Sequence, residues 1–241
     1  RDRAPTPEEL CKLLEVGDLR ERFIVACLAL GGFREGTLAA LRYCHVRTDI
    51  EKDITPVHIH VEAEITKGKY HDYNTFLGAE AAEYLRLYLE QRRRGSPCGK
   101  VPPEELQDES PLIRHSRHRK PEPIGAKQIY EVVHNLYIKA GLLKQKKGRR
   151  YDLRVHSIRK FFRTQLAALG VPGDYIEYMM GHTISTYHDI EMKGVDFLRN
   201  VYAASGLSIK PKTKLTQYEL MATFVRGLGL DPEKVLIREA F

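Results

Sequence analysis

The segment His156-Ser157-Ile158-Arg159-Lys160-Phe161-Phe162 is followed further along the chain by Met180-Gly181-His182. His156 and Arg159 are three residues apart, so on a helix they share one face and can point at one anion. His182 follows a glycine at a helix terminus, where it adds a donor beside backbone amides that lack an intrahelical partner. The motif contains no acidic partner for these donors. Such a set suits a phosphodiester, whose negative charge grows in the transition state.

Hydrophobic patterning around this segment indicates a mainly α protein with a small antiparallel β-hairpin, an α+β class. Alternating residues at 58–63, a turn at 66–70 and a second strand at 73–77 predict the hairpin. A capping box with Pro at the first helical position begins the first helix at Thr6. Helices are predicted at 7–14, 18–31, 35–41, 79–94, 128–140, 156–169, 174–180, around 197–201, 216–227 and 231–241.

Three further segments complete an ordered set of motifs. GFREGTLAALR at 32–42 comes first, ITKGK at 65–69 lies in the predicted hairpin turn, and STYHD at 185–189 follows the MGH tripeptide. Each segment alone is common in solvated loops and helices. Their order along the chain is what makes them informative together.

In this order the motifs resemble the tyrosine recombinase (phage integrase) family, whose pattern is Arg, Lys, His-x-x-Arg, His and Tyr. The resemblance spans about residues 5–205 and looks closest to integrases of archaeal viruses and plasmids. It implies a catalytic domain of the tyrosine recombinase fold over residues 1–207 and a C-terminal helical extension over 208–241. It also implies an N-terminal DNA-binding domain that is absent from the sequence given.

The resemblance implies a catalytic role for five donors. Arg34 and Arg159 would clamp the non-bridging oxygens of the scissile phosphate, and Lys67 would be the general acid. His156 and His182 would be supporting donors, and His156 would also accept the proton of the attacking tyrosine. Lys69, two residues after Lys67, stays open as an alternative acid.

The nucleophile is a choice between two tyrosines. In the family pattern the tyrosine comes somewhat later than residue 187, at the position that Glu191 occupies here. Tyr187 lies in the segment that looks like the nucleophile segment of the family and precedes a predicted helix at 197–201, so we favour it. Tyr202 is the alternative. The early position of Tyr187 leaves open whether it acts in its own protomer or in a neighbour.

The charge of the chain favours a polyanionic partner. The 241 residues include 39 Lys and Arg against 32 Asp and Glu, a net charge of +7. Two basic runs are therefore predicted to contact the phosphates of double-stranded DNA. They comprise Arg114, Arg117, Arg119, Lys120, Lys144, Lys146, Lys147, Arg149 and Arg150.

Several other classes are disfavoured. His115 and His118 lack Cys or acidic partners at ligand spacing, and no carboxylate cluster is present to hold ions, so neither a metal site nor a metal-dependent nuclease is expected. No cofactor is expected. The four cysteines are scattered and no apolar run approaches the ~20 residues of a membrane span, which predicts a cytoplasmic protein. The resemblance implies that it is nucleoid-associated and encoded by a virus or plasmid.

The expected activity is site-specific cleavage and rejoining of DNA through a 3′-phosphotyrosyl intermediate, without ATP or metal. The expected assembly is a monomer in isolation and a tetramer in the synaptic complex. A type IB topoisomerase or telomere resolvase would use the same chemistry, and a non-catalytic DNA-binding protein could share the fold. Both remain alternatives at this point.

Overall fold

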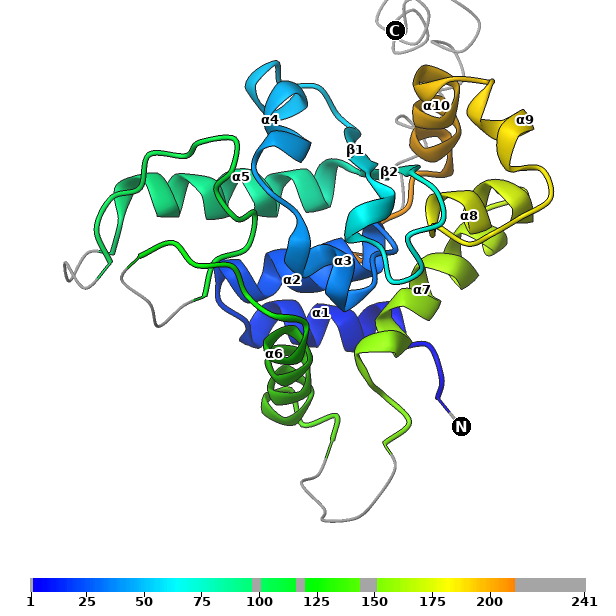
Figure 1. The fold of residues 1–241 in the computed structure, drawn as a ribbon. Helices are drawn as coiled ribbons and strands as arrows, with labels where there is room; N and C mark the ends of the chain where they lie inside the picture. The colour runs from blue at the N-terminus through cyan, green and yellow to red at the C-terminus, as the bar shows by residue number, and fades with distance from the viewer. Residues whose placement is uncertain (1, 97–100, 116–119, 144–150, 211–241) are drawn as a thin grey trace, which may run out of the picture. The chain divides into compact units, whose positions relative to one another are not determined.

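The computed structural model describes residues 2–96, 101–115, 120–143 and 151–210. These residues form a mainly helical body with one two-stranded antiparallel sheet (Figure 1), which confirms the predicted fold class. The elements in chain order are α1 (Pro7–Val16), α2 (Leu19–Leu30), α3 (Glu35–Ala40), α4 (Cys44–Glu51), β1 (Val57–Val61), a 3-10 turn (Ala63–Ile65), β2 (Tyr73–Leu77), α5 (Ala79–Arg94), α6 (Ala126–Lys139), α7 (Val155–Ala168), α8 (Gly173–Met179), α9 (Tyr187–Glu191) and α10 (Val195–Ser205).

The predicted helices through residue 180 are confirmed, with shifts of a few residues at their ends. The capping box at the first helix is formed as expected, because Thr6 accepts from the amide of Glu9 and the Glu9 side chain accepts from the amide of Thr6. Two short helices, α4 and α9, were not predicted. Neither has a side-chain N-cap hydrogen bond, so the usual local start signal is missing. The helices predicted at 216–227 and 231–241 lie outside the described residues.

Helix α2 is the centre of the fold. All residues from Phe23 to Leu30 are buried, which is the pattern of a helix covered on every side. It packs against α1, α5, α6 and α7, and Figure 1 shows it crossing the middle of the molecule. The chain leaving α2 is therefore held firmly where it turns toward α3.

A glycine at that turn sets how closely α3 approaches α7. Gly32 has a φ of +67°, and a Cβ there would lie 2.6 Å from the ring of Phe162 on α7. Only glycine combines this backbone conformation with such a close approach. The turn brings Arg34, at the start of α3, next to the face of α7 that carries Arg159.

The hairpin has a defined register, with Val57 opposite Leu77 and Val61 opposite Tyr73. Val57, Ile59 and Val61 are buried, while the residues between them are more exposed, as a strand with one face on the core requires. The connection from residue 62 to 72 projects from the end of the hairpin and carries Lys67. The predicted turn between two paired strands is confirmed.

Clustering of contacts divides the chain into two units, residues 1–209 and 210–241. The functional residues described below all belong to the first unit. No helix in the described ranges combines the length and the apolar character that a membrane crossing requires.

Candidate active site

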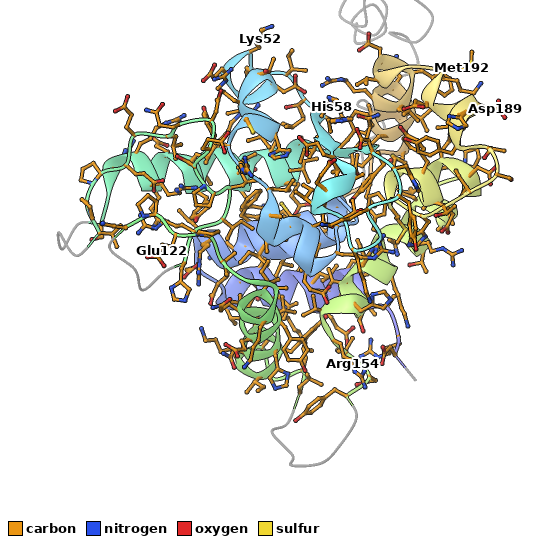
Figure 2. The ribbon with its side chains drawn as sticks, viewed as in Figure 1. Lys52, His58, Glu122, Arg154, Asp189 and Met192 are labelled. Carbon is orange, nitrogen blue, oxygen red and sulfur yellow. The ribbon has the colours of Figure 1, made fainter. Side chains whose placement is uncertain are left out.

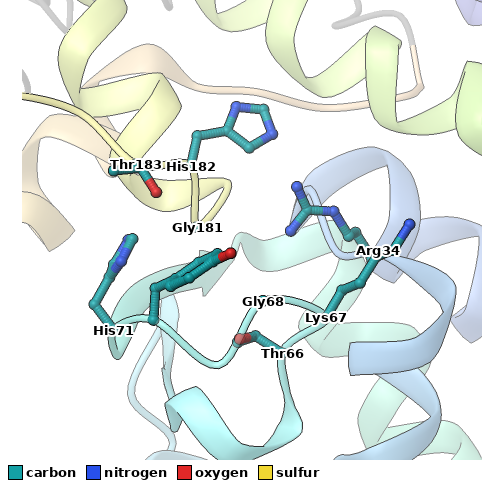
Figure 3. A pocket seen from close by; sticks show the side chains of 9 residues that line it. Arg34, Thr66, Lys67, Gly68, His71, Gly181, His182 and Thr183 are labelled. Carbon is teal, nitrogen blue, oxygen red and sulfur yellow. The ribbon is translucent and has the colours of Figure 1, made fainter.

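A cavity of about 500 Å³ opens where α3, the hairpin connection and the end of α8 meet. It brings together Arg34, Lys67 and His182, three of the donors predicted from sequence. Figure 3 shows the guanidinium of Arg34 and the imidazole of His182 facing the same hollow, while the side chain of Lys67 crosses that of Arg34 in this view. The remaining lining residues are Thr66, Gly68, Tyr70, His71, Gly181 and Thr183.

Arg159 lies beside this cavity and is almost fully buried, at 2% exposed. Its Nη2 donates to the carbonyl of Met180 and to Nε2 of His182, the latter at 3.2 Å. Its Nε is buried and has no hydrogen-bond partner among the residues that the structure describes. Burial, together with repulsion from Arg34, lowers the pKa of Arg159 to about 10. The site thus holds a buried cation with an unused donor, an arrangement that favours an anionic ligand.

His182 is fixed between an acid and a cation. Its Nδ1 hydrogen-bonds to Oε2 of Glu177, which also pairs with Arg163, and these contacts hold the pKa of Glu177 below its ordinary value. Because Arg159 donates to Nε2, the ring proton of a neutral His182 is on Nδ1 and is donated to Glu177. Burial lowers the pKa of His182, Arg159 and Arg34 lower it further, and Glu177 opposes them.

Glu177 corrects the expectation that the motif has no acidic partner. It lies five residues before His182, near the end of α8, and its side chain is half-buried. A single glutamate on a helix gives no sequence signal of this role. Gly181, just before His182, has a φ of +64° and lies against the ring of Tyr73, where a Cβ would come within 2.4 Å of a ring atom. Glycine is therefore required at this position.

Tyr73 is a second residue that sequence reasoning missed. Its side chain is buried at the start of β2, and burial raises the pKa of its hydroxyl to about 12. Arg159 and Arg34 both lie close enough to oppose that shift, and the hydroxyl hydrogen-bonds to the side chain of Thr37. Tyr73 therefore lies against Gly181 and close to both arginines.

His156 lies on the first turn of α7 and its side chain is exposed. Its pKa is lowered by partial desolvation and by the neighbouring charges of Arg159 and Lys160. It is not among the residues that line the cavity, and no described hydrogen bond joins it to Tyr187. Its predicted roles as donor and as proton acceptor stay predictions.

Tyr187 lies at the start of α9, next to the cavity but not in its lining. Its hydroxyl donates to the carbonyl of Asp72, at 2.6 Å, and its ring meets the edge of His71, which does line the cavity. Burial raises the pKa of Tyr187, and the neighbouring Tyr178, Glu191 and Asp72 raise it further. In this conformation the hydroxyl is protonated and donates to the last residue of the hairpin connection.

The helix that carries Tyr187 has few other contacts with the core. Ile190 is the only residue of α9 that is buried, and Asp189 and Met192 point away from the molecule at its edge (Figure 2). Met192 is 86% exposed. A helix held by so little buried surface can move without disturbing the core.

Tyr202 is not available as a nucleophile, which corrects the alternative considered from sequence. It is 2% exposed, and its hydroxyl donates to the carbonyl of Leu30 and accepts from the amide of Gly78. Burial raises its pKa. Tyr202 joins α10 to α2 and α5 and has a structural role.

Arg114 also differs from the prediction. It is 5% exposed and forms an ion pair with Glu104, which is shared with Arg92, so it is not free to contact DNA phosphates as expected. Lys120 is exposed, and its DNA contact stays a prediction. The other basic residues of that prediction lie outside the described residues, namely Arg117, Arg119, Lys144, Lys146, Lys147, Arg149 and Arg150.

Metal ligation has no geometric support in the part of the chain that the structure describes. No group of three or more His, Cys, Asp or Glu side chains there lies close enough together to hold an ion. The donors around the cavity are instead guanidinium, ammonium and imidazole groups, which bind anions.

Three solved structures show the same fold at low sequence identity. The chain is similar to XerA recombinase (20% identity, TM-score 0.56, covering 93% of this chain and 65% of that one). It is also similar to an integrase from mycobacterium phage Brujita (17%, 0.57, 92% and 63%). The third is XerH site-specific recombinase bound to a palindromic difH substrate (19%, 0.51, 83% and 49%). The chain thus spans less than two thirds of the length of these proteins.

The chain matches no curated protein at a significant level. The model of the phage integrase family matches residues 6–189, a range that contains Arg34, the hairpin, α7, His182 and Tyr187. This protein therefore belongs to the phage integrase family.

Proposed function

We propose that this chain is the catalytic domain of a tyrosine-type site-specific recombinase. It cleaves and rejoins DNA strands through a 3′-phosphotyrosyl intermediate, and needs neither ATP nor metal. The observation that carries the proposal is Arg159, a buried guanidinium without a carboxylate at ion-pair distance among the described residues and with an unpartnered Nε beside a cavity lined by cations. Membership of the phage integrase family supports DNA as the proposed substrate.

Each donor has a different role at the scissile phosphate. Arg34 and Arg159 approach it from α3 and α7 and neutralise the charge on its non-bridging oxygens. His182 is held by Glu177, so its Nε2 faces Arg159 and the cavity rather than solvent. Lys67, on the hairpin connection, protonates the departing 5′-oxygen.

The nucleophilic step requires Tyr187 to leave its contact with the carbonyl of Asp72. The raised pKa of Tyr187 means that the phenol stays protonated and inactive in the described conformation. Attack forms the bond from the phenolic oxygen to phosphorus and breaks the bond to the 5′-oxygen. A free 5′-hydroxyl then reverses the step, so the energy of the phosphodiester is conserved and no ATP is consumed.

The partner proposed is double-stranded DNA, in line with the structure of XerH bound to a palindromic difH substrate. A synaptic tetramer, formed from chains that are monomers in isolation, belongs to the same proposal. The domain organisation predicted from sequence, the archaeal virus or plasmid source and the nucleoid-associated location stay predictions. The family match does not favour a type IB topoisomerase, a telomere resolvase or a non-catalytic binder.

The first experiment uses a site selected by this protein from a random DNA library and rebuilt as a nicked suicide duplex. Wild type, Tyr187→Phe and Tyr202→Phe are incubated with it, and the denaturant-resistant protein–DNA adduct is measured. We expect adduct from wild type and Tyr202→Phe and none from Tyr187→Phe. Tyr202→Phe should also lower the free energy of unfolding by about 1 kcal/mol, because a buried hydroxyl with two partners is removed.

Two results would contradict the proposal in different ways. Adduct from Tyr187→Phe would move the nucleophile to another residue and keep the chemistry. No adduct from folded wild type, despite measured DNA binding, would argue for a non-catalytic DNA-binding protein.

A further inference from the structure

Tyr70 is an aromatic residue that the sequence motifs do not assign. It is 83% exposed, and yet it lines the cavity together with Arg34, Lys67 and His182. Its hydroxyl has no hydrogen bond among the described residues. A large flat ring left open to solvent inside a cationic cavity is unfavourable by itself and is typical of a surface that contacts a ligand.

The connection between the strands is shaped to hold this ring against Gly68, the residue that follows Lys67. Thr66 Oγ1 donates to the carbonyl of Ala63 at 2.8 Å and accepts from the amide of Lys69 at 3.0 Å. Lys69 has a φ of +53°, which residues other than glycine rarely adopt. This turn folds Tyr70 back over Gly68.

The contact with Gly68 is close. A Cβ at Gly68 would lie 2.5 Å from two atoms of the Tyr70 ring, so the ring lies directly on the glycine backbone. One face of the ring therefore covers the residue that follows Lys67, and the other is left to the cavity and solvent. The position of the ring and the position of the Lys67 backbone are coupled through a single residue.

We propose that Tyr70 is a positioning residue for the cleavage step. Its ring packs on the sugar and base of the nucleotide that carries the departing 5′-oxygen, and so aligns that oxygen with the ammonium of Lys67. The inference rests on the proposed function. Cations attract a phosphate without fixing which bridging oxygen faces the acid, whereas stacking of an aromatic ring on a nucleotide fixes its orientation.

The step balances as follows. The Tyr187 hydroxyl gives up its proton, for which His156 is the predicted acceptor, and its oxygen bonds to phosphorus. The bond from phosphorus to the 5′-oxygen breaks, and its electron pair stays on that oxygen, which takes a proton from Lys67. If sulfur replaces the bridging 5′-oxygen, the leaving group is a thiolate, which is stable without the proton. A residue that serves only to align the departing oxygen with the acid should then matter much less to the rate.

The experiment compares two nicked suicide duplexes of the selected site, one with the ordinary 5′-oxygen and one with 5′-sulfur at the scissile position. The rate of adduct formation is measured under single-turnover conditions. The variants are Tyr70→Ala, Tyr70→Phe, Gly68→Ala and Lys67→Ala. Tyr130→Ala is the matched control, because Tyr130 is an exposed aromatic on α6 that does not line the cavity.

We expect Tyr70→Ala to slow cleavage of the oxygen duplex by about tenfold or more, the loss typical of one base–aromatic stack. Most of that loss should disappear with sulfur, as it should for Lys67→Ala. Tyr70→Phe keeps the ring and should recover the rate lost in Tyr70→Ala. Gly68→Ala displaces the ring and should act in the same direction as Tyr70→Ala, while Tyr130→Ala should match wild type on both duplexes.

The inference is overturned if Tyr70→Ala matches wild type, or if it loses equal rate on both duplexes, since the ring would then not act through the acid. Failure of sulfur to rescue Lys67→Ala would mean that Lys67 is not the acid with which Tyr70 is proposed to align the departing oxygen, and would also overturn the inference. Absence of adduct from wild type on both duplexes would overturn the proposed function and this inference with it. Normal wild-type cleavage with an unaffected Tyr70→Ala leaves the proposed function intact.

Discussion

Two regions of this protein bury arginines, and they do so in opposite ways. Arg92 and Arg114 are 4% and 5% exposed and share the carboxylate of Glu104, while Arg92 also donates to the carbonyls of Pro111 and Leu112. Arg159 is 2% exposed, has no carboxylate at ion-pair distance within the described ranges and keeps an unpartnered Nε. Burial and repulsion from Arg34 lower the pKa of Arg159 to about 10.

The difference separates a structural arginine from one kept for a ligand. Burying a charge is unfavourable unless hydrogen bonds and an opposite charge compensate for the lost hydration. The Glu104 cluster supplies both within the fold. Arg159 lacks an opposite charge and leaves its Nε without a hydrogen bond among the described residues. A phosphate in the adjacent cavity would supply both the negative charge and the acceptor.

Removal of Glu104 should have the largest effect on stability. Glu104→Ala leaves two buried guanidinium groups without their carboxylate, and we expect a loss of about 3–5 kcal/mol in the free energy of unfolding, measured by urea denaturation. Glu109→Ala is the control, because Glu109 pairs with Arg42 on the surface, where a change of less than about 1 kcal/mol is expected. A small loss in Glu104→Ala would mean that the cluster is not a structural ion pair.

Arg159→Met should lower activity strongly and leave stability almost unchanged, whereas Glu104→Ala lowers stability. We expect the rate of adduct formation to fall about 10²–10³-fold, the usual result of deleting one donor to a developing charge. Stability should stay the same or rise, because the variant removes a buried charge that the fold compensates only in part. If Arg159→Met destabilised the protein as much as Glu104→Ala does, Arg159 would be a structural arginine like Arg92 and Arg114.

The smallest expected effect is the pH dependence of stability contributed by His182. Its pKa in the folded protein is below the ordinary 6.5 because burial and the two arginines disfavour its charged form. The unfolded chain therefore binds more protons between that lowered pKa and 6.5, so stability falls as pH decreases through this window. His58 and His156 have lowered pKa values and contribute with the same sign.

Thermal melts of wild type and His182→Gln from pH 7.5 to 5 measure the contribution of His182. The melting temperature should depend less steeply on pH in the variant than in wild type. Part of the dependence should remain, because His58 and His156 also contribute to it. An unchanged or steeper slope in His182→Gln would contradict the burial and repulsion assigned to this imidazole.

Local patterns in the sequence determined most of the secondary structure and part of the site. The spacing of His156 and Arg159 predicted a helix that carries both, and the alternation at 58–63 with the turn at 66–70 predicted the hairpin. The order of the motifs led to Arg34, Lys67 and His182, which the fold brings to one cavity. These features depend on residues close together in the chain, or on a family pattern that the sequence retains.

Burial, partners and orientation were decided by the tertiary structure. Arg114 and Arg159 are both arginines in basic surroundings, and nothing local says that the first is paired inside the fold while the second is not. Tyr187 and Tyr202 differ because α10 packs Tyr202 against α2 and α5, whereas α9 rests at the edge of the molecule. These outcomes depend on contacts between segments far apart in the sequence, which local periodicity does not encode.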